Sequence, residues 1–372
     1  MNQTILKNLI NLDTVRRFHK GIIIDFAGPR SVLSTSMLNG GLTTNLTSVF
    51  NFNCLADEYD CTLRFASYEE ELRDNAKSLE LDPDYCSGLS TAAFMECVAI
   101  ESMSFNNLTV TSIVTAGIDQ NAVRVGDPSS YFEQNNHYEM LQKGTINILL
   151  HINRQLVPGA MARALSMATE AKTAAIGELM LGSNYSTGIA TGSGTDGVIV
   201  ISDASSEEIC TDAGGHSKLG ELIGQCVKAA VKEALLKQTA ASPARQHTLL
   251  ERGKRYHITL SLFWDVYCRY FTDKDLNSGI SLKELENKIM YYNTNSNLVV
   301  FVSTYLNLMD QFQWGLFEWS EVLRESKSMC RWYLERNGLT DASIYDLSYN
   351  CNNPIEGLLT LLIHTILMRV LP

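Results

Sequence analysis

The order of elements between residues 144 and 236 constrains the fold more than any other feature of the chain. Residues 144–153 alternate between aliphatic and mostly polar side chains, which is typical of a strand with one apolar face. Alanine-rich residues 161–179 follow at helical spacing, and their small side chains predict close packing on a sheet. The β-branched run 197–202 predicts a buried strand, and a second helix begins at His216. This strand–helix–strand–helix order predicts helices packed over a β-sheet.

The flanking regions extend this picture in both directions. Residues 21–28 and 30–41 each predict a strand, the second running into a turn at Asn39-Gly-Gly where positive φ angles or a plain hairpin would fit. Residues 107–118 also alternate as a strand does. We therefore predict an α/β or α+β fold, a layered sandwich of one or more β-sheets flanked by helices, with a mostly helical C-terminal region.

A change in composition near residue 240 predicts two parts. Residues 238–247 read Gln-Thr-Ala-Ala-Ser-Pro-Ala-Arg-Gln-His, which is typical of a linker. The residues beyond are rich in aromatic side chains and helical in period. We predict a first domain at 1–238, a linker at 239–248 and a helical region at 249–372, whose role the sequence leaves open.

Composition and charge exclude several classes of protein. Charged residues make up 19% of the chain and hydrophobic ones 45%, which excludes a disordered or fibrous protein. The net charge of −11 argues against nonspecific binding of nucleic acid or anionic membranes. The first twenty residues lack the apolar core of a signal peptide, so we expect a cytoplasmic protein. The apolar run 358–371 is short and contains His364 and Arg369, which predicts a buried helix and no membrane span.

Cysteines and histidines give no metal signature. The nine cysteines are widely spaced without a C-x-x-C pair, which predicts reduced thiols and neither a disulfide framework nor a zinc site. The histidines lie at positions 19, 137, 151, 216, 247, 257 and 364, in no H-E-x-x-H or H-x-H order. We expect no metal and no cofactor, with a magnesium site of scattered oxygens as the alternative. Oligomeric state stays open, with a homo-oligomer as one option.

Three polar, glycine-spaced segments, 168–173, 191–197 and 214–224, carry most of the candidate chemistry, because glycine lets the backbone approach a ligand closely. Segment 191–197 lacks the order of a phosphate-binding loop and precedes a strand, so a tight hairpin would also explain it. Its carboxylate stands among three hydroxyls, which a hairpin does not require: Asp196 with Thr191, Ser193 and Thr195.

Other candidates each have a structural explanation as well. His216 suits a general acid or base, because this is the residue type most often used for proton transfer near neutral pH, but it could equally be a solvated residue at a helix start. Glu170 and Lys172 would fit the surface of an amphipathic helix, and Asn147 could pair with neighbours in its strand. No G-x-S-x-G or Cys-His signature indicates a familiar hydrolase triad.

Taken in order, four segments resemble the adenosylcobinamide amidohydrolase family: 144–148, 168–175, 190–197 and 215–224. Segments 32–36, 39–41 and 114–118 resemble it too. The resemblance covers roughly residues 21–236, best after residue 144 and poorly between residues 55 and 106. Ser193 departs from the threonine expected there, and Gly215 precedes His216 where threonine is common. The resemblance implies hydrolysis of the amide that joins the aminopropanol arm of adenosylcobinamide to the corrin ring, which yields adenosylcobyric acid. The corrinoid is then the substrate, and no cofactor is needed.

The resemblance also implies roles for the candidate residues. His216 would be a general acid or base, and Glu170 or Asp196 would orient it or activate water. Lys172 and Asn147 would polarise the carbonyl or hold the oxyanion. We favour water as the nucleophile, with a hydroxyl as the alternative. The expected substrate-binding residues are Asn147, Thr191, Ser193, Thr195, Ser34, Asn39, Ser217 and Lys218.

One structural analogy and two alternative functions stand beside this hypothesis. The helix and glycine turn are similar, as an analogy only, to ornithine acetyltransferases and related aminopeptidases, whose folds are α/β/β/α sandwiches. A noncatalytic corrinoid or nucleotide binding protein is the alternative function, although the D-x-H-x-x-G motif of a corrinoid carrier is absent around Asp212 and His216. An interaction module at residues 250–372, with the first part as its scaffold, is a third reading.

Overall fold

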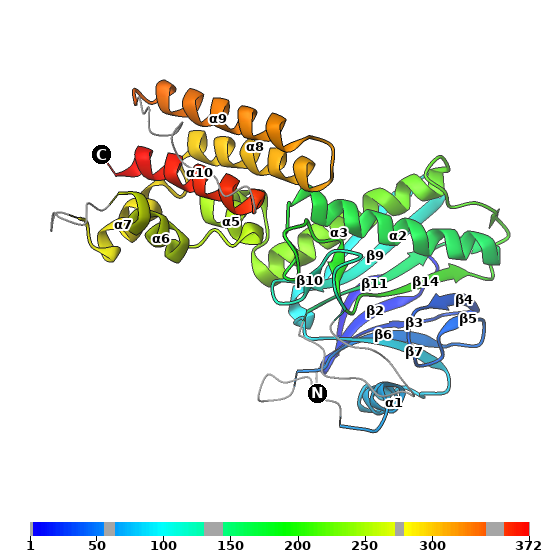
Figure 1. Cartoon of the computed structure of the whole chain (residues 1–372). Helices are drawn as coiled ribbons and strands as arrows, with labels where there is room; N and C mark the ends of the chain where they lie inside the picture. The colour runs from blue at the N-terminus through cyan, green and yellow to red at the C-terminus, as the bar shows by residue number, and fades with distance from the viewer. Residues whose placement is uncertain (1–2, 56–63, 130–143, 272–278, 340–352, 372) are drawn as a thin grey trace. The chain divides into compact units, whose positions relative to one another are not determined.

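The computed structural model describes residues 3–55, 64–129, 144–271, 279–339 and 353–371. The chain divides into two compact units, Met1–Ser242 and Pro243–Pro372 (Figure 1). In the described residues, the first unit contains two large β-sheets, two two-stranded sheets and three helices of more than one turn, and the second unit is helical. Each unit has its own hydrophobic core.

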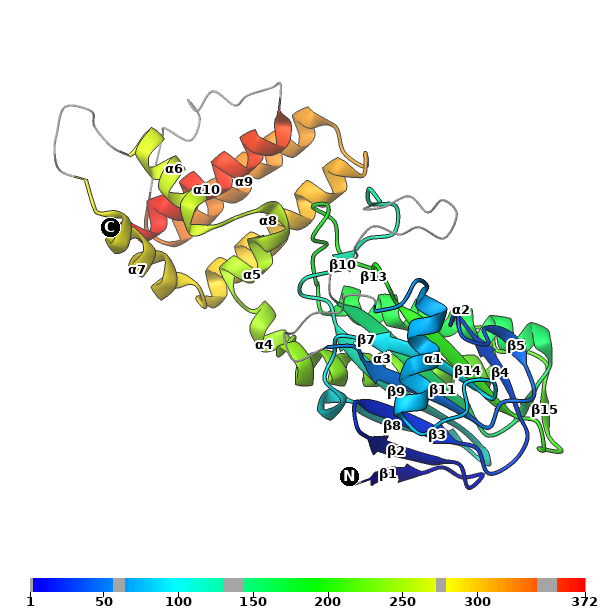
Figure 2. The same cartoon turned by 90° about the horizontal axis from the view of Figure 1, so that it is seen from below.

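One sheet of the first unit, here called sheet A, has five strands in the order β1-β2-β3-β6-β7. Their bounds are Thr4–Asn8, Thr14–Phe18, Gly21–Asp25, Ser48–Asn53 and Cys86–Thr91. All neighbours run antiparallel except β6 and β7. Helix α1 (Tyr68–Ser78) covers the outer face of this sheet (Figure 2), where Leu72 and Ala76 pack with Ile23 and Phe50.

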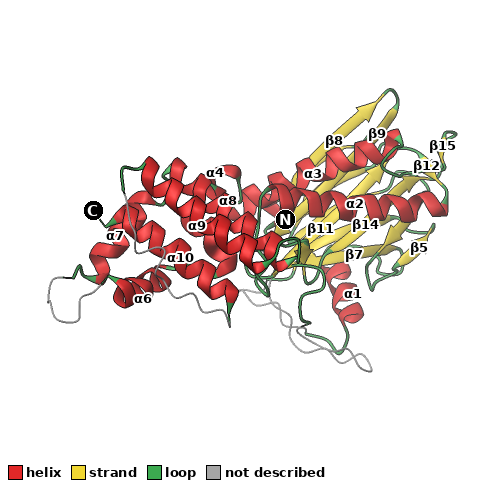
Figure 3. Cartoon of the chain, turned by 45° about the horizontal axis from the view of Figure 1, so that its top comes forward, coloured by secondary structure: helices red, strands yellow, loops and turns green. Residues whose placement is uncertain are grey.

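The second sheet, sheet B, has six strands in the order β5-β4-β14-β11-β9-β8. Their bounds are Gly41–Thr43, Arg30–Ser34, Gly197–Asp203, Thr145–Ile152, Leu108–Gly117 and Ala99–Phe105. Only β11 and β14 are parallel. Helices α2 (Pro158–Glu178) and α3 (Lys218–Thr239) lie side by side over the outer face of this sheet (Figure 3). Their alanines make this close approach possible, because Ala164, Ala168 and Ala175 are fully buried against the sheet core.

The inner faces of the two sheets pack on each other. Val15, Ile22 and Val49 of sheet A meet Leu149 and Ile199 of sheet B in one cluster. The first unit is therefore a layered α/β/β/α sandwich, and the predicted layered fold is confirmed. The mostly polar face of strand β11 is as buried as its apolar face, because it lies between the two sheets.

Short elements complete the first unit. Strand β10 (Ala122–Val123) pairs with β13 (Gly192–Ser193), and β12 (Gln155–Leu156) pairs with β15 (Ile209–Cys210). A 3-10 turn spans Met95–Cys97. Strands β4 and β5 form an antiparallel hairpin in which Asn39 and Gly41 have φ angles of 48° and 78°, so both alternatives considered for this turn are present.

The second unit consists of helices, as predicted for the C-terminal region. Their bounds, from α4 to α10, are Pro243–Gln246, Leu249–Gly253, Leu260–Tyr270, Leu282–Tyr292, Ser296–Gln313, Trp319–Arg336 and Pro354–Val370, with a 3-10 turn at Lys254–Tyr256. Helix α4 lies within the predicted linker 239–248. The buried helix predicted at 358–371 is confirmed, because Leu361, Leu362 and Ile366 of α10 are fully buried. In the described part of the chain, no helix is long and apolar enough to cross a membrane.

Most described cysteines agree with the expected reduced thiols. Six are free, and burial raises the pKa of the Cys86 and Cys226 thiols to about 12. Cys54, however, is disulfide-bonded, so the expectation was wrong for that residue.

Candidate active site

Asp196 organises a polar cluster at one end of sheet B, immediately before β14 begins. Its Oδ2 atom pairs with the Lys172 ammonium and accepts a hydrogen bond from the Ser193 N–H at 3.0 Å. Its Oδ1 atom accepts hydrogen bonds from the Ser193 hydroxyl at 2.5 Å and from the Ile146 N–H at 3.0 Å. Four donors therefore surround one carboxylate.

Two threonines extend this arrangement. The Thr195 hydroxyl lies 2.5 Å from the Thr145 hydroxyl and donates to the Gly144 carbonyl at 3.0 Å. The Thr195 N–H donates to Ser193 Oγ at 3.2 Å. We call Thr145, Lys172, Ser193, Thr195 and Asp196 the Asp196 cluster.

Glycine at position 192 allows the backbone to pass close to the Lys172–Asp196 ion pair. A Cβ atom on Gly192 would lie 2.7 Å from Lys172 Nζ and would overlap Asp196 Oδ2. Only a residue without a side chain lets this backbone approach the ion pair so closely. The glycine spacing of segment 191–197 thus has a physical reason beyond a tight turn.

The ion pair is shielded from solvent but not sealed. The side chains of Lys172 and Asp196 keep 9% and 11% of their exposure, and neighbouring Gly194 is exposed. Charges act more strongly in such a poorly solvated place than in water. The cluster could therefore act on a slender group that enters past the glycine turn.

Asn147 does not belong to this cluster. Its side chain is buried between the sheets, where Nδ2 donates to Asn51 Oδ1 at 2.8 Å and to the Ser90 carbonyl at 2.9 Å. Both N–H bonds are thus used, and none is left for a substrate oxygen. The structure gives Asn147 the role of joining the two sheets, in place of the oxyanion role we expected.

Three other predicted substrate-binding residues also hold the fold together. Ser34 is buried and bonds to the Ser87 hydroxyl at 2.9 Å. Asn39 donates to the carbonyls of Pro83 at 2.8 Å and Cys86 at 2.7 Å. Thr191 Oγ1 accepts from the Val125 N–H at 2.9 Å, which fixes the loop next to β13.

Glu170 faces away from Asp196. It is exposed on α2, whereas Lys172 is buried, because residues two apart on a helix point to nearly opposite sides. The structure therefore does not place Glu170 where it could orient a group of the cluster.

His216, Ser217 and Lys218 lie at the other end of sheet B. Ser217 caps α3 by accepting from the Gly220 N–H at 3.0 Å, and His216 beside it is exposed. Lys218 pairs with Glu221 at 2.5 Å and lies 4.7 Å from the centre of the Phe105 ring.

The length of strand β9 gives the distance between the two ends of sheet B. Phe105 pairs with Leu108 at the start of β9, whereas Thr145 pairs with Gly117 at its end. Since β9 has ten residues, these ends lie about 30 Å apart. The structure therefore does not bring His216 close to Asp196, as the role implied for His216 by the resemblance would require. Helix α3 begins beyond the carboxyl ends of the parallel strands, whereas Asp196 precedes the amino end of β14.

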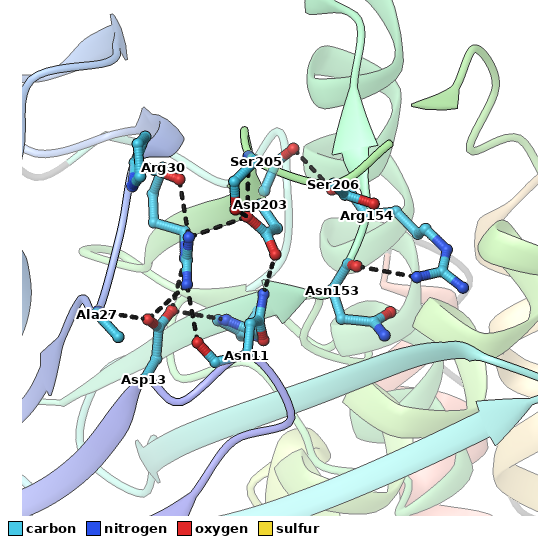
Figure 4. Close-up of polar contacts among 12 residues, drawn as sticks. Asn11, Asp13, Ala27, Arg30, Asn153, Arg154, Asp203, Ser205 and Ser206 are labelled. Carbon is cyan, nitrogen blue, oxygen red and sulfur yellow. Dashed lines mark hydrogen bonds and ion pairs between the residues drawn. The ribbon is translucent and has the colours of Figure 1, made fainter. Parts of the chain in front are cut away.

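A second polar cluster, which the sequence did not reveal, lies at the carboxyl end of β14 (Figure 4). Arg30 donates to both oxygens of Asp13 at 2.8 and 2.7 Å, and to Asp203 at 2.9 Å. His151 Nε2 lies 3.0 Å from Asp13 Oδ2. All four side chains are buried, and we call them the Arg30 network.

The Arg30–Asp13 pair at the centre of the network is buried, with side chains 2% and 0% exposed. Burial alone would raise the pKa of Asp13, but hydrogen bonds with His151, Arg30 and the Ala27 N–H outweigh it and hold this pKa below its usual value. Contacts with Ser205, Asn11 and Arg30 likewise lower the pKa of Asp203. Because Arg30 and Asp203 are 173 positions apart in the sequence, no local pattern could have predicted this contact.

No group of three or more His, Cys, Asp or Glu side chains could hold a metal ion among the residues that the structure describes. The Asp196 cluster contributes one carboxylate, one ammonium and hydroxyl groups. This donor set suits proton transfer and stabilisation of negative charge more than metal binding.

Comparison with known proteins places the chain in a family. It is 33% identical over 244 residues to the uncharacterized protein MJ1613 of Methanocaldococcus jannaschii, covering 63% of this chain and 92% of that protein. The crystal structure of the PH0078 protein from Pyrococcus horikoshii OT3 matches 64% of this chain and 80% of its own, at 11% identity and a TM-score of 0.28, too low to bear on the fold. The model of the adenosylcobinamide amidohydrolase family matches residues 6–243. The chain therefore belongs to the adenosylcobinamide amidohydrolase family.

Proposed function

We propose that this protein hydrolyses the amide that joins the aminopropanol arm of adenosylcobinamide to the corrin ring, and that the Asp196 cluster is where it does so. One observation carries the location. Asp196 holds an ammonium group on one oxygen and a hydroxyl on the other, beside an exposed glycine, within the part of the chain that matches the family.

These groups supply what amide hydrolysis needs. Attack on the carbonyl carbon creates negative charge on the carbonyl oxygen, and the leaving nitrogen needs a proton before it departs. The Lys172 ammonium can stabilise that charge and give that proton. Asp196 keeps the lysine in place and accepts a proton from the attacking group.

The partial burial of the cluster fits a substrate with a slender arm. A corrin ring is too large to reach a pair that is about nine-tenths shielded. The aminopropanol arm is a narrow chain that ends in a hydroxyl, so its amide could enter past Gly194 while the ring stays outside. We propose that Thr195, next to this turn, contacts the polar groups of the arm.

The decisive experiment incubates the purified full-length protein with adenosylcobinamide and identifies products by chromatography and mass spectrometry. We expect aminopropanol and adenosylcobyric acid in equal amounts. The donor set leads us to expect the same rate after dialysis against EDTA. Binding of the corrinoid, seen as a spectral shift without either product, would instead support a noncatalytic corrinoid-binding protein.

A further inference from the structure

The hydroxyl groups around Asp196 are not equivalent. Thr195 donates to the Gly144 carbonyl, and Thr145 bonds to Thr195. Thr173 donates to the Thr191 carbonyl at 3.0 Å. Ser193 differs, because its proton points to the Asp196 carboxylate at 2.5 Å. A hydroxyl whose proton already has a carboxylate acceptor is the one best prepared to attack.

The Asp196 carboxylate also has no site left for a water molecule. Two carboxylate oxygens offer about four lone-pair positions. The Lys172 ammonium, the Ser193 N–H, the Ser193 hydroxyl and the Ile146 N–H occupy four. Water could be activated by Asp196 only after one of these donors had left, whereas Ser193 needs no rearrangement.

We propose that Ser193 is the nucleophile and that the reaction passes through an ester between its Oγ atom and the corrin side-chain acyl group. This inference rests on the proposed function and replaces water as the first attacking group. Ser193 is about nine-tenths buried next to exposed Gly194, and its hydroxyl lies on the carboxylate of the ion pair.

The first half of the reaction balances with the groups present. Ser193 Oγ bonds to the carbonyl carbon while its proton moves to Asp196 Oδ1. The C–N bond breaks, and Lys172 gives one proton to the leaving nitrogen, which departs as the aminopropanol amine. The proton on Asp196 then passes to Lys172 through their contact, which restores the ion pair.

The second half uses water as its only co-reactant. Water attacks the ester carbon, the bond to Ser193 Oγ breaks, and the carboxylic acid leaves. One water proton returns to Ser193 Oγ through the Lys172–Asp196 pair. The net change is one amide and one water converted to one acid and one amine.

The test looks for the ester directly. Enzyme and excess adenosylcobinamide are mixed, and the reaction is quenched in acid during turnover. The protein is then digested, and the mass of the peptide containing Ser193 is measured by mass spectrometry. Hydroxylamine is added in parallel, because it converts an ester intermediate into a hydroxamate without changing a rate of amine release that is limited by ester formation. We expect the added acyl mass on Ser193, or hydroxamate formation at a constant rate of aminopropanol release.

Two variants separate chemistry from folding. Ser193→Thr keeps a hydroxyl and should retain the intermediate, whereas Ser193→Ala should lose at least about 10³-fold in turnover. The melting temperature and corrinoid binding of Ser193→Ala should stay close to those of the unchanged protein.

The outcomes are distinct. Release of aminopropanol with neither adduct nor constant-rate hydroxamate would overturn the Ser193 proposal and leave the proposed function standing. Turnover by Ser193→Ala within about tenfold of the unchanged protein would do the same, since removing a true nucleophile costs far more. No release of aminopropanol by the unchanged protein would overturn both.

Discussion

The Asp196 cluster and the Arg30 network lie at opposite ends of β14, and in each a cationic side chain pairs with one or two carboxylates. They differ in solvent access and in the kind of cation. The side chains of Arg30 and Asp13 are 2% and 0% exposed and that of Asp203 is 10% exposed, whereas the Lys172 and Asp196 side chains retain 9% and 11%. The cation itself is therefore sealed from solvent only in the Arg30 network. An arginine in a two-point contact with a carboxylate stays charged and fixed, whereas a lysine can give up a proton. A buried cluster of polar side chains is therefore not by itself evidence of an active site. A lysine that can transfer a proton and is partly open to solvent is better evidence.

Removing the lysine should have the largest effect. Lys172→Met leaves Asp196 with three hydrogen bonds but takes away the cation and proton donor, so we expect turnover to fall by about 10³-fold. Lys172→Arg is the matched control, because it keeps the charge but cannot release a proton at neutral pH. Product formation by both variants is compared, with corrinoid binding measured by absorbance. Full activity of Lys172→Arg would show that charge alone is needed.

A substitution in the Arg30 network should lower the free energy of unfolding and leave turnover unchanged. Arg30→Met leaves the carboxylates of Asp13 and Asp203 without their cation, so we expect a loss of about 3–5 kcal/mol in the free energy of unfolding. The turnover of the folded protein should stay within about twofold, since the side chains of this network bond to one another at the far end of β14 from Asp196.

The chain offers an internal control for that measurement. All four tryptophans, at positions 264, 314, 319 and 332, belong to residues 243–372. Tryptophan fluorescence therefore follows the second unit during urea unfolding, and far-UV circular dichroism follows both. Arg30→Met should shift the circular dichroism transition of the first unit and leave the fluorescence transition in place. A large loss of turnover in the folded variant would instead link the Arg30 network to catalysis.

The contrast between the two regions also shows what the sequence could predict. Ser193, Thr195 and Asp196 were candidates because a short turn must bring them together, and Lys172 because its segment resembled the family. The separation of His216 depends on the length of β9, and the Arg30 network depends on pairing between two sheets, so neither has a local pattern. The layered fold was predictable from periodicity. That Asn147 is buried against Asn51 was not, because an alternating strand does not show whether its polar face meets water or another sheet.

The close approach at Gly192 gives a more graded test of the Asp196 cluster. In Gly192→Ala the new methyl group would push apart Lys172 and Asp196, and such a displacement should reduce turnover by about 10- to 100-fold. Gly215→Ala is the control, because a Cβ atom there meets nothing within 4 Å. Initial rates of both variants are compared at saturating corrinoid. Equal rates would mean that the ion pair does not have to be held at its observed position.

The pH dependence of the free energy of unfolding tests the lowered pKa of Asp13 in the Arg30 network. The folded pKa of Asp13 lies below its usual value of 3.8, so Asp13 stabilises the fold above about pH 4 and this contribution disappears as pH falls through the lower folded pKa. Asp13→Asn has no proton to take up and should lose less stability over that range. The difference in slope should be at most about 1.4 kcal/mol per pH unit. Urea unfolding followed by circular dichroism between pH 5 and 2.5 measures it, and equal slopes would contradict a lowered pKa.

The smallest expected effect decides which end of the sheet is catalytic. His216 is exposed at the start of α3, and about 30 Å of strand β9 separates that region from the end where Thr145 and Asp196 lie. His216→Ala should therefore change turnover by less than about twofold, as expected for an exposed side chain away from the reacting groups. Its rate is measured beside that of Lys172→Met. If His216→Ala lost activity as strongly while Lys172→Met did not, the chemistry would belong at the carboxyl ends of β11 and β14, and the Asp196 cluster would be the structural one.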